Sequence, residues 1–288
     1  MTAASQLRQL LQRPEIVIAP GVYDGLTARL AEQAGFAAVY MTGAGTSAAR
    51  GYPDYGLLTM TEMADNAALI ARSVTVPVIA DADTGYGNEL NVTRTVREFE
   101  ARGIASIHIE DQVAPKRCGH LDDKEVVSRE EFVSKIRAAL SARRDPDFLI
   151  IARTDARAVM DLDEAIARAN AALAAGADMA FVEATQTLDE MKTVPARVKG
   201  PCLLNVVPGG KTPAVKMSVA QAMGYRLAIL PGIALKAIVE ACDEAFATLK
   251  STQLPPVGGA LKVHDLFRKV GAEEWDALRK QFQAQVIA

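Results

Sequence analysis

Cysteine is scarce in this sequence, and the three that occur show no paired spacing. Cys118, Cys202 and Cys242 make an odd count, which excludes a disulfide framework as the basis of the fold. Cys202 lies in an apolar run and Cys242 in a helical pattern, so we expect both to be small buried hydrophobic residues. Cys118 differs because basic residues flank it on both sides, and nearby cations favour the thiolate over the thiol.

Long apolar runs and an excess of charge of one sign are absent as well. No run approaches the roughly 20 residues that a membrane-spanning helix needs, and the N-terminal stretch is too polar for a signal peptide. The formal net charge is −3 without a dense basic stretch, which argues against nucleic acid and anionic membranes as partners. With 50% hydrophobic and 23% charged residues, the composition predicts a globular protein of the cytoplasm.

Short β-branched runs alternate with amphipathic helical stretches along most of the chain. Eight runs are expected strands: residues 16–18, 38–41, 78–80, 106–109, 149–152, 179–182, 203–207 and 227–230. One of the helices between them has a capping-box-like start at Ser128 and Glu131. Eight strand–helix units in a chain of 288 residues predict a (β/α)8 TIM barrel over residues 1–250.

A doubly wound open sheet is the competing architecture. Such a sheet usually binds its ligand through one glycine-rich turn, whereas polar residues here follow at least five different strands. In a parallel barrel all these strand ends open on one face and converge on one pocket. The residues concerned are Thr42, Gly43, Asp81, Asp83, Glu110, Asp111, Arg153, Asp155, Glu183 and Asn205.

The tail after residue 250 changes character. A linker-like stretch at 254–259 precedes two expected short helices, at 264–270 and 273–286. We therefore assign residues 251–288 to a C-terminal helical arm. This arm packs either on a neighbouring subunit or on its own barrel, and the sequence favours neither.

Three carboxylates predict a metal site. Asp81 and Asp83 are separated by one residue, so on a strand both side chains point to the same face. With Glu110 they form a cluster suited to a hard cation such as Mg²⁺, with Mn²⁺ as the alternative ion. His108 shares the face of Glu110, but no cysteine or second histidine lies nearby, so we expect it to orient the substrate or a ligand rather than to bind zinc.

Two further groups are suited to bind an oxyacid. The Arg153 guanidinium can form a bidentate hydrogen bond to a carboxylate or bind an enolate oxygen, and it can also form a salt bridge with Glu183. Gly43 and Ala44 follow a strand and can present backbone N–H groups to a carboxylate. In the loop that carries Cys118, Lys116 and Arg117 either bind a distal carboxylate or only keep the loop solvated.

Five motifs carry a resemblance to a known superfamily. They are DADTGYGN at 81–88, EDQ at 110–112, PKRCGH at 115–120, IARTD at 151–155, and Asn205 followed by GKTP at 210–213. Together they resemble the isocitrate lyase / phosphoenolpyruvate mutase superfamily over residues 16–249. The KRCGH loop resembles its carbon–carbon lyase branch, which includes 2-methylisocitrate lyase and dimethylmalate lyase, but carboxyphosphonoenolpyruvate mutase shares that loop.

The resemblance implies a Mg²⁺-dependent barrel that forms a homotetramer, with the eighth helix exchanged between paired subunits. It places Asp81, Asp83 and Glu110 around the metal, directly or through water, and makes Cys118 the general acid on a mobile loop. The general base is either Tyr40 or a metal-bound water. The implied substrate contacts are Tyr40, Thr42, Gly43, Ala44, Asp81, His108, Gly119, His120, Arg153, Glu183 and Asn205.

The implied activity is cleavage of a 2-hydroxy di- or tricarboxylate, of the 2-methylisocitrate or alkylmalate type, to a 2-oxoacid such as pyruvate. A phosphonate-forming mutase, an oxaloacetate hydrolase or decarboxylase, and a non-catalytic oxyacid sensor are the alternatives. The chain departs from the pattern at Pro208, where relatives carry an acidic residue, and at Pro231-Gly232-Ile233, where relatives carry Pro-Leu-Ser. The loss of the acid bears on the second half of the substrate, and the second change removes a hydroxyl from the edge of the pocket.

Overall fold

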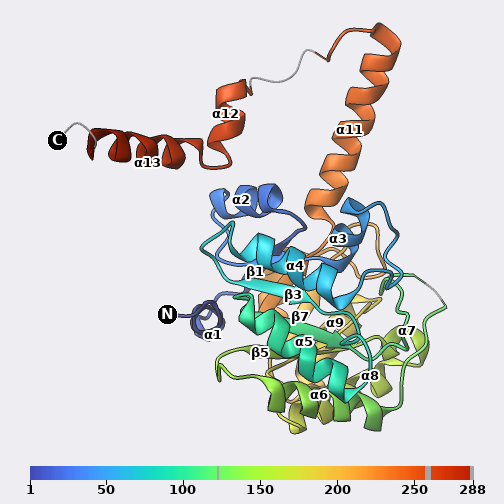
Figure 1. The fold of residues 1–288 in the computed structure, drawn as a ribbon. Helices are drawn as coiled ribbons and strands as arrows, with labels where there is room; N and C mark the ends of the chain where they lie inside the picture. Colours follow the sequence, from blue (N-terminus) through green and yellow to red (C-terminus); the bar gives the residue numbers. More distant parts are fainter. Residues whose placement is uncertain (122, 257–260, 286–288) are drawn as a thin grey trace. The chain divides into compact units, whose positions relative to one another are not determined.

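The computed structural model describes residues 1–121, 123–256 and 261–285. Eight parallel strands close into a barrel in chain order, with β8 paired back to β1 (Figure 1). The strands are β1 (Val17–Val22), β2 (Val39–Met41), β3 (Val78–Asp81), β4 (Ser106–Glu110), β5 (Leu149–Thr154), β6 (Met179–Val182), β7 (Cys202–Asn205) and β8 (Leu227–Leu230). All eight strands predicted from the β-branched runs are present, and the (β/α)8 barrel is confirmed.

Helices follow each strand, and most begin at a side chain that caps the first turn. Ser128 accepts a hydrogen bond from the Glu131 amide at 3.1 Å, but Glu131 pairs with Lys135, so only half of the expected capping box forms. The barrel helices are α1 (Ala3–Gln12), α2 (Gly25–Gln33), α3 (Gly43–Ala49), α4 (Met60–Ala71), α5 (Glu89–Ala101), α6 (Arg129–Ala142), α7 (Ala156–Val159), α8 (Leu162–Ala174), α9 (Leu188–Arg197) and α10 (Met217–Met223).

The strands divide the core into an inner and an outer part. Outward-facing Ile107 and Ile109 pack under the helices, and an inner cluster around Tyr40, Ile151 and Phe181 fills the barrel. β4 differs because its inward residues are polar, with the ring of His108 stacked near Tyr40 and edge-on to Phe181. The alternation of side chains along a strand therefore aims the polar residues of β4 at the barrel axis.

The chain divides by contacts into two compact units, Met1–Leu235 and Lys236–Ala288. The second unit contains most of α11 (Ile233–Thr252), with α12 (Val263–Arg268) and α13 (Ala272–Gln285). The second unit therefore contains most of α11, whereas the sequence predicts that the C-terminal arm begins after residue 250. The two tail helices match the predicted ones, but residues 257–260 of the predicted linker and residue 286 of the last helix lie outside the described residues.

α11 has no buried residue in the described chain, although every other strand is followed by at least one helix with buried residues. Cys242 on α11 is consequently only half-buried, so the prediction that it is buried is wrong. Cys202 on β7 is buried as expected. No helix of the described residues is both long enough and apolar enough to cross a lipid bilayer.

Candidate active site

The predicted site residues gather at the carboxyl ends of the barrel strands. Tyr40 lies on β2, Asp81 ends β3, His108 and Glu110 lie on β4, and Arg153 lies on β5. Register pairing sets Asp81 beside His108 and Glu110 beside Arg153 on neighbouring strands. The remaining predicted residues follow strands at the same end: Thr42, Gly43 and Ala44 after β2, Asp83 after β3, Cys118, Gly119 and His120 in the loop after β4, Glu183 after β6, and Asn205 at the end of β7.

Asp81 is the centre of a buried polar group. Its Oδ2 lies 3.3 Å from the Tyr40 hydroxyl, which in turn lies 2.9 Å from His108 Nε2. Burial opposes ionisation of Asp81, but nearby His108 and Lys116 hold the pKa of this carboxyl at about 2. Burial lowers the pKa of His108 to about 4, so the ring is neutral at pH 7. Tyr40 retains its proton because burial and the charge of Asp81 raise its pKa well above 10.

The start of α3 approaches Asp81 closely. A Cβ added at Gly43 would lie 2.5 Å from Asp81 Oδ2, so only glycine fits beside this carboxylate. Thr42 caps the helix, because its Oγ1 accepts a hydrogen bond from the Gly45 amide at 3.3 Å. This close approach brings the backbone of α3 beside Asp81, while the predicted contact of Gly43 and Ala44 with a substrate carboxylate stays a prediction.

Asp83 does not lie on the strand, so the predicted shared face with Asp81 is wrong. The residue adopts a positive φ of 46° in the turn after β3, which breaks the two-residue alternation of a strand. The two acids still meet, because the Asp83 amide donates to Asp81 Oδ1 at 3.0 Å. Burial raises the pKa of Asp83 to about 6, even though Lys116 opposes the shift.

Lys116 is buried between two acids. Its Nζ lies 2.5 Å from Asp54 Oδ1 and 3.0 Å from Asp83 Oδ1. Burial opposes the ammonium form, but Asp83 and Asp54 outweigh it and raise the pKa of Lys116 well above its ordinary value. Lys116 is therefore a fixed buried cation, and of its two predicted alternatives this excludes the one in which it only keeps the loop solvated. Arg117 is about half exposed and meets Asp123 at 3.8 Å.

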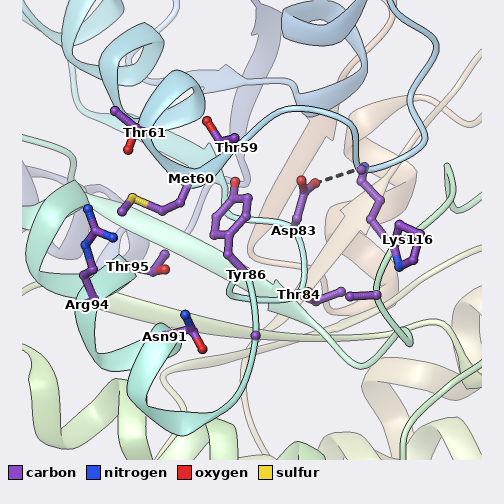
Figure 2. A pocket seen from close by; sticks show the side chains of 14 residues that line it. Thr59, Met60, Thr61, Asp83, Thr84, Tyr86, Asn91, Arg94, Thr95 and Lys116 are labelled. Atoms are coloured by element: carbon purple, nitrogen blue, oxygen red, sulfur yellow. Dashed lines mark ion pairs between the residues drawn. The ribbon is translucent and has the colours of Figure 1, made fainter.

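A cavity of about 570 Å³ adjoins this ion pair. Figure 2 shows Asp83 facing Lys116 beside Tyr86 in the wall of the cavity. Thr59 and Met60 at the start of α4 form another part of the wall. The cavity therefore lies beside Asp83 and Lys116, between the starts of α4 and α5, and neither Cys118 nor Arg153 is among its lining residues.

Arg153 joins several acids at the barrel axis. Its Nη1 lies 3.0 Å from Glu110 Oε2, and its Nε lies 2.9 Å from Asp155 Oδ2. The predicted pairing with Glu183 is the longest of the three contacts, at 3.6 Å. Burial raises the pKa of Glu110 well above its ordinary value although the arginine opposes that shift.

The Cys118 loop closes over this arginine. Gly119 packs on Arg153 and Glu183, since an added Cβ would lie 2.5 Å from Arg153 Nη2. His120 Nε2 lies 3.1 Å from Glu183 Oε1, and the amide of Asn205 donates to both Glu183 oxygens, at 3.2 and 3.0 Å. The loop thus touches the ends of β5, β6 and β7.

Cys118 is a thiol rather than a thiolate in this structure. Burial raises the pKa of Cys118, and the charge of Asp54 adds to the increase. The prediction that flanking cations favour the thiolate is wrong, because burial and the charge of Asp54 raise the pKa of Cys118 more than Lys116 lowers it. A protonated thiol at the mouth is a proton donor.

The described residues contain no group of three or more His, Cys, Asp and Glu side chains placed to hold a metal ion by themselves. The predicted metal residues are nevertheless suited to a partly hydrated cation. Among the described atoms, the buried Oε1 of Glu110 has no hydrogen-bond partner, and Oε2 meets Arg153 alone. Oxygen ligands with intervening water are the usual surroundings of Mg²⁺.

The family profile of phosphoenolpyruvate phosphomutase matches residues 7–250. The chain belongs to this family. It is 48% identical over 252 residues to a 2,3-dimethylmalate lyase of Eubacterium barkeri, covering 87% of each chain. It is also 46% identical to a 2-methylisocitrate lyase of Aeropyrum pernix over 249 residues, which is 86% of this chain and 80% of the relative.

Solved structures from the phosphomutase family agree with the fold. A 2,3-dimethylmalate lyase crystal structure superposes with a TM-score of 0.93 at 43% identity, covering 98% of this chain and 95% of the other. An oxaloacetate acetylhydrolase in complex with 3,3-difluorooxalacetate gives 0.94 at 39% identity, covering 99% and 97%. A phosphonopyruvate hydrolase in complex with oxalate and Mg²⁺ gives 0.89 at 34% identity, covering 98% and 100%. The superfamily resemblance of the five motifs is confirmed.

Sequence reasoning missed two residues that this site uses. Asp54 pairs with Lys116 from a loop that follows no strand. Lys124 is buried against Asp155 at 3.0 Å. The only sequence signal for Lys124 was its place near the end of the Cys118 loop, where a solvated lysine is the ordinary expectation.

Proposed function

We propose that this protein is a divalent-metal-dependent carbon–carbon lyase. Its substrate is a 2-hydroxy di- or tricarboxylate of the alkylmalate or 2-methylisocitrate type, which it cleaves to a 2-oxoacid and a carboxylate. The observation that carries the proposal is the position of the Cys118 loop, whose Gly119 packs directly on Arg153 and Glu183 at the barrel axis. Similarity to 2,3-dimethylmalate lyase and 2-methylisocitrate lyase over more than four fifths of the chain supports it.

Asp81, Asp83 and Glu110 would hold the cation, which we propose to be Mg²⁺, with Mn²⁺ as the alternative. A bound cation would polarise the hydroxyl and carboxylate oxygens of the substrate. The unpartnered Oε1 of Glu110 supports this assignment, as does the Mg²⁺ in the related phosphonopyruvate hydrolase. The buried pair of Asp83 and Lys116 would fix one side of the site.

Arg153 would bind the substrate carboxylate or the developing oxoacid oxygen. Its guanidinium is already oriented by Glu110 and Asp155, and fixed donors stabilise charge without reorganisation during the reaction. Other groups would line the substrate: Tyr40, Thr42, Gly43, Ala44, Asp81, His108, Gly119, His120, Glu183 and Asn205.

Cleavage breaks the bond between C2 and C3 of the substrate. The hydroxyl proton leaves to a base, the electron pair of the O–H bond becomes the second bond of the new C2 carbonyl, and the C2–C3 bonding pair stays on C3. Cys118 then donates its proton to C3, provided that the closed loop excludes water. Tyr40 holds its proton in this structure, so we assign it to orient the substrate hydroxyl and leave proton removal to water.

The test is a substrate panel with the purified protein and Mg²⁺. We expect pyruvate from 2,3-dimethylmalate or 2-methylisocitrate, detected by coupled lactate dehydrogenase, and loss of the signal with a chelator that excess Mg²⁺ reverses. The co-products are propionate and succinate, respectively, which mass balance requires. Absence of any 2-oxoacid from every alkylmalate and isocitrate tested would contradict the proposal.

Oxaloacetate hydrolysis is the second candidate, because an oxaloacetate acetylhydrolase is structurally similar over nearly the whole chain. Oxaloacetate in the same panel, with detection of oxalate and acetate, separates it from the lyase. A phosphonate-forming mutase is the third, and phosphorus NMR of carboxyphosphonoenolpyruvate would reveal its carbon–phosphorus bond.

We also propose that the chain assembles as a homotetramer through its second unit, with α11 exchanged between paired subunits in the cytoplasm. Several large apolar side chains of this unit are exposed, including Phe246, Phe267 and Trp275. Apolar surface of this extent is usually covered by a partner. Light scattering should give four times the 30.7 kDa chain mass, and a monomer at micromolar concentration would contradict the assembly.

A further inference from the structure

The loop between β4 and α6 has a fixed stem and a part that lies over the barrel axis. Its stem is tied by hydrogen bonds from the Val113 amide to Glu125 O and from the Val127 amide to Asp111 O, both at 2.9 Å. Gln112 stands at the bridge of this stem and pairs with the backbone of Arg117 through both ends of its amide. The stem therefore holds the residues next to it in place.

Lys124 lies next to this stem and is buried, with its side chain about 1% exposed. Its ammonium group donates to two acceptors. It donates to Asp155 Oδ1 at 3.0 Å, and it donates to the carbonyl oxygen of Gly119. A lysine is seldom buried this fully unless its charge is paired, so these contacts fix where the group sits.

Both partners of Lys124 bear directly on the proposed site. Asp155 also accepts from Arg153 Nε at 2.9 Å and from Nη2 at 3.3 Å, so it orients the guanidinium. Gly119 is the neighbour of Cys118 and packs on the same guanidinium. Asp111 fixes the backbone of Asp155, because the Asp155 amide donates to Asp111 Oδ1 at 2.8 Å.

We propose that Lys124 is a positioning residue that latches the Cys118 loop shut and couples closure to the orientation of Arg153. Asp155 is the shared acceptor of the latch. When the loop opens, Gly119 leaves Lys124, and the ammonium–aspartate pair becomes exposed to water, where it is weaker. Closure therefore brings the thiol over the site and seats Lys124 against Asp155, the same carboxylate that accepts from Arg153. The catalytic consequence depends on the proposed lyase function, whereas the latch itself does not.

The test measures access to the Cys118 thiol in the free protein. The variant Lys124→Met removes the charge and keeps most of the length, and iodoacetamide followed by peptide mass mapping reads each cysteine separately. We expect Cys118 of this variant to be alkylated about tenfold faster than in the wild type, because the loop opens more often. Loss of a nearby cation by itself would lower the thiolate fraction and slow alkylation, so acceleration reports access.

Controls separate the latch from a general loss of structure. Lys124→Arg keeps a charged donor and should return the alkylation rate toward that of the wild type. Arg117→Met removes an exposed cation from the same loop and should not accelerate the reaction. Cys202, buried on β7, should stay unreactive in every variant, and its alkylation would reveal unfolding.

The variant Asp155→Asn removes the carboxylate that pairs with Lys124. If the two residues act as one latch, the double variant with Lys124→Met is alkylated no faster than the faster single variant. The proposal would be overturned if the two substitutions multiplied the alkylation rate of Cys118 in the double variant. It would also be overturned if Cys118 of Lys124→Met reacted within twofold of the wild-type rate. Because alkylation needs no substrate, these results stand even if no lyase activity is found. With an active enzyme, kcat should fall in Lys124→Met and recover in Lys124→Arg.

Discussion

Gly119 lies so close to Arg153 that a Cβ on the glycine would fall 2.5 Å from Nη2. The backbone of the Cys118 loop is thus in direct contact with the cation proposed to bind the substrate. A side chain at this position has to displace either the arginine or the loop. The contact therefore ties the closed position of the loop to the presence of glycine.

The variant Gly119→Ala should lose activity without losing the fold. The methyl group holds the loop away from Arg153, and misplacement of about 1 Å costs about 100-fold in kcat when it separates a catalytic group from its target. The melting temperature should stay near that of the wild type because the loop lies at the mouth of the barrel. Steady-state kinetics with the best panel substrate measures the change.

Gly232→Ala provides the matched control, because nothing lies within 4 Å of a Cβ placed at Gly232. It should keep the wild-type melting temperature, and its kcat should fall much less than that of Gly119→Ala, because its methyl group displaces no neighbour. Equal activity in Gly119→Ala and the wild type would show that the loop does not close as described.

Removal of Lys116 should destabilise the protein. Lys116→Met leaves the buried Asp83 and the partly buried Asp54 without their shared cation, and breaking a buried pair in this way costs about 3–5 kcal/mol. Urea unfolding monitored by circular dichroism measures the free energy of unfolding. Lys192→Met is the control, because Lys192 is about 61% exposed and its removal should change stability by under about 0.5 kcal/mol. A similar small change in Lys116→Met would contradict the buried pair.

Most of the fold could be predicted from the sequence because its signals are local. The alternation of Ile107 and Ile109 with polar neighbours identifies β4, and the polar residues at successive strand ends follow from the parallel barrel. The pairings that decide the site are not local. Lys116 meets Asp54 across 62 residues, and Lys124 meets Asp155 across 31.

The errors at Asp83 and Cys118 have the same origin. A one-residue spacing predicts a shared face only while the strand continues, and the strand ends at Asp81. Basic neighbours predict a thiolate only while the thiol is solvated, and burial of Cys118 raises its pKa more than Lys116 lowers it. Residue types at strand ends therefore predicted which side chains gather, but not which of them neutralise one another.

The stability of the wild type should fall in mild acid because of His108. Its folded pKa of about 4 lies below the ordinary value of 6.5, so the unfolded chain binds the proton more tightly. The stability that this histidine contributes is present above pH 6.5 and is lost as the pH falls toward 4. Between pH 7 and pH 4.5 the loss is about 2 kcal/mol.

The variant His108→Gln isolates this contribution, because glutamine is polar but does not titrate. The free energy of unfolding of both proteins, measured in urea at the two pH values, should show a steeper fall in the wild type by about 2 kcal/mol. Equal falls would mean that His108 is not buried as a neutral ring.

Cys118→Ala should abolish most of the turnover while leaving substrate binding largely intact. A positioned general acid contributes about 10²–10⁴-fold, so kcat should fall by that range and KM should change little.

In the wild type the thiol has to be protonated to act, and burial raises its pKa above the ordinary 9.0. Activity should therefore be lost as the pH rises through that raised value, with the alkaline limb of kcat above pH 9. Cys202→Ala and Cys242→Ala are matched controls that should keep both the turnover and the limb. Full turnover in Cys118→Ala, or an alkaline limb near pH 7, would remove Cys118 from the role of proton donor.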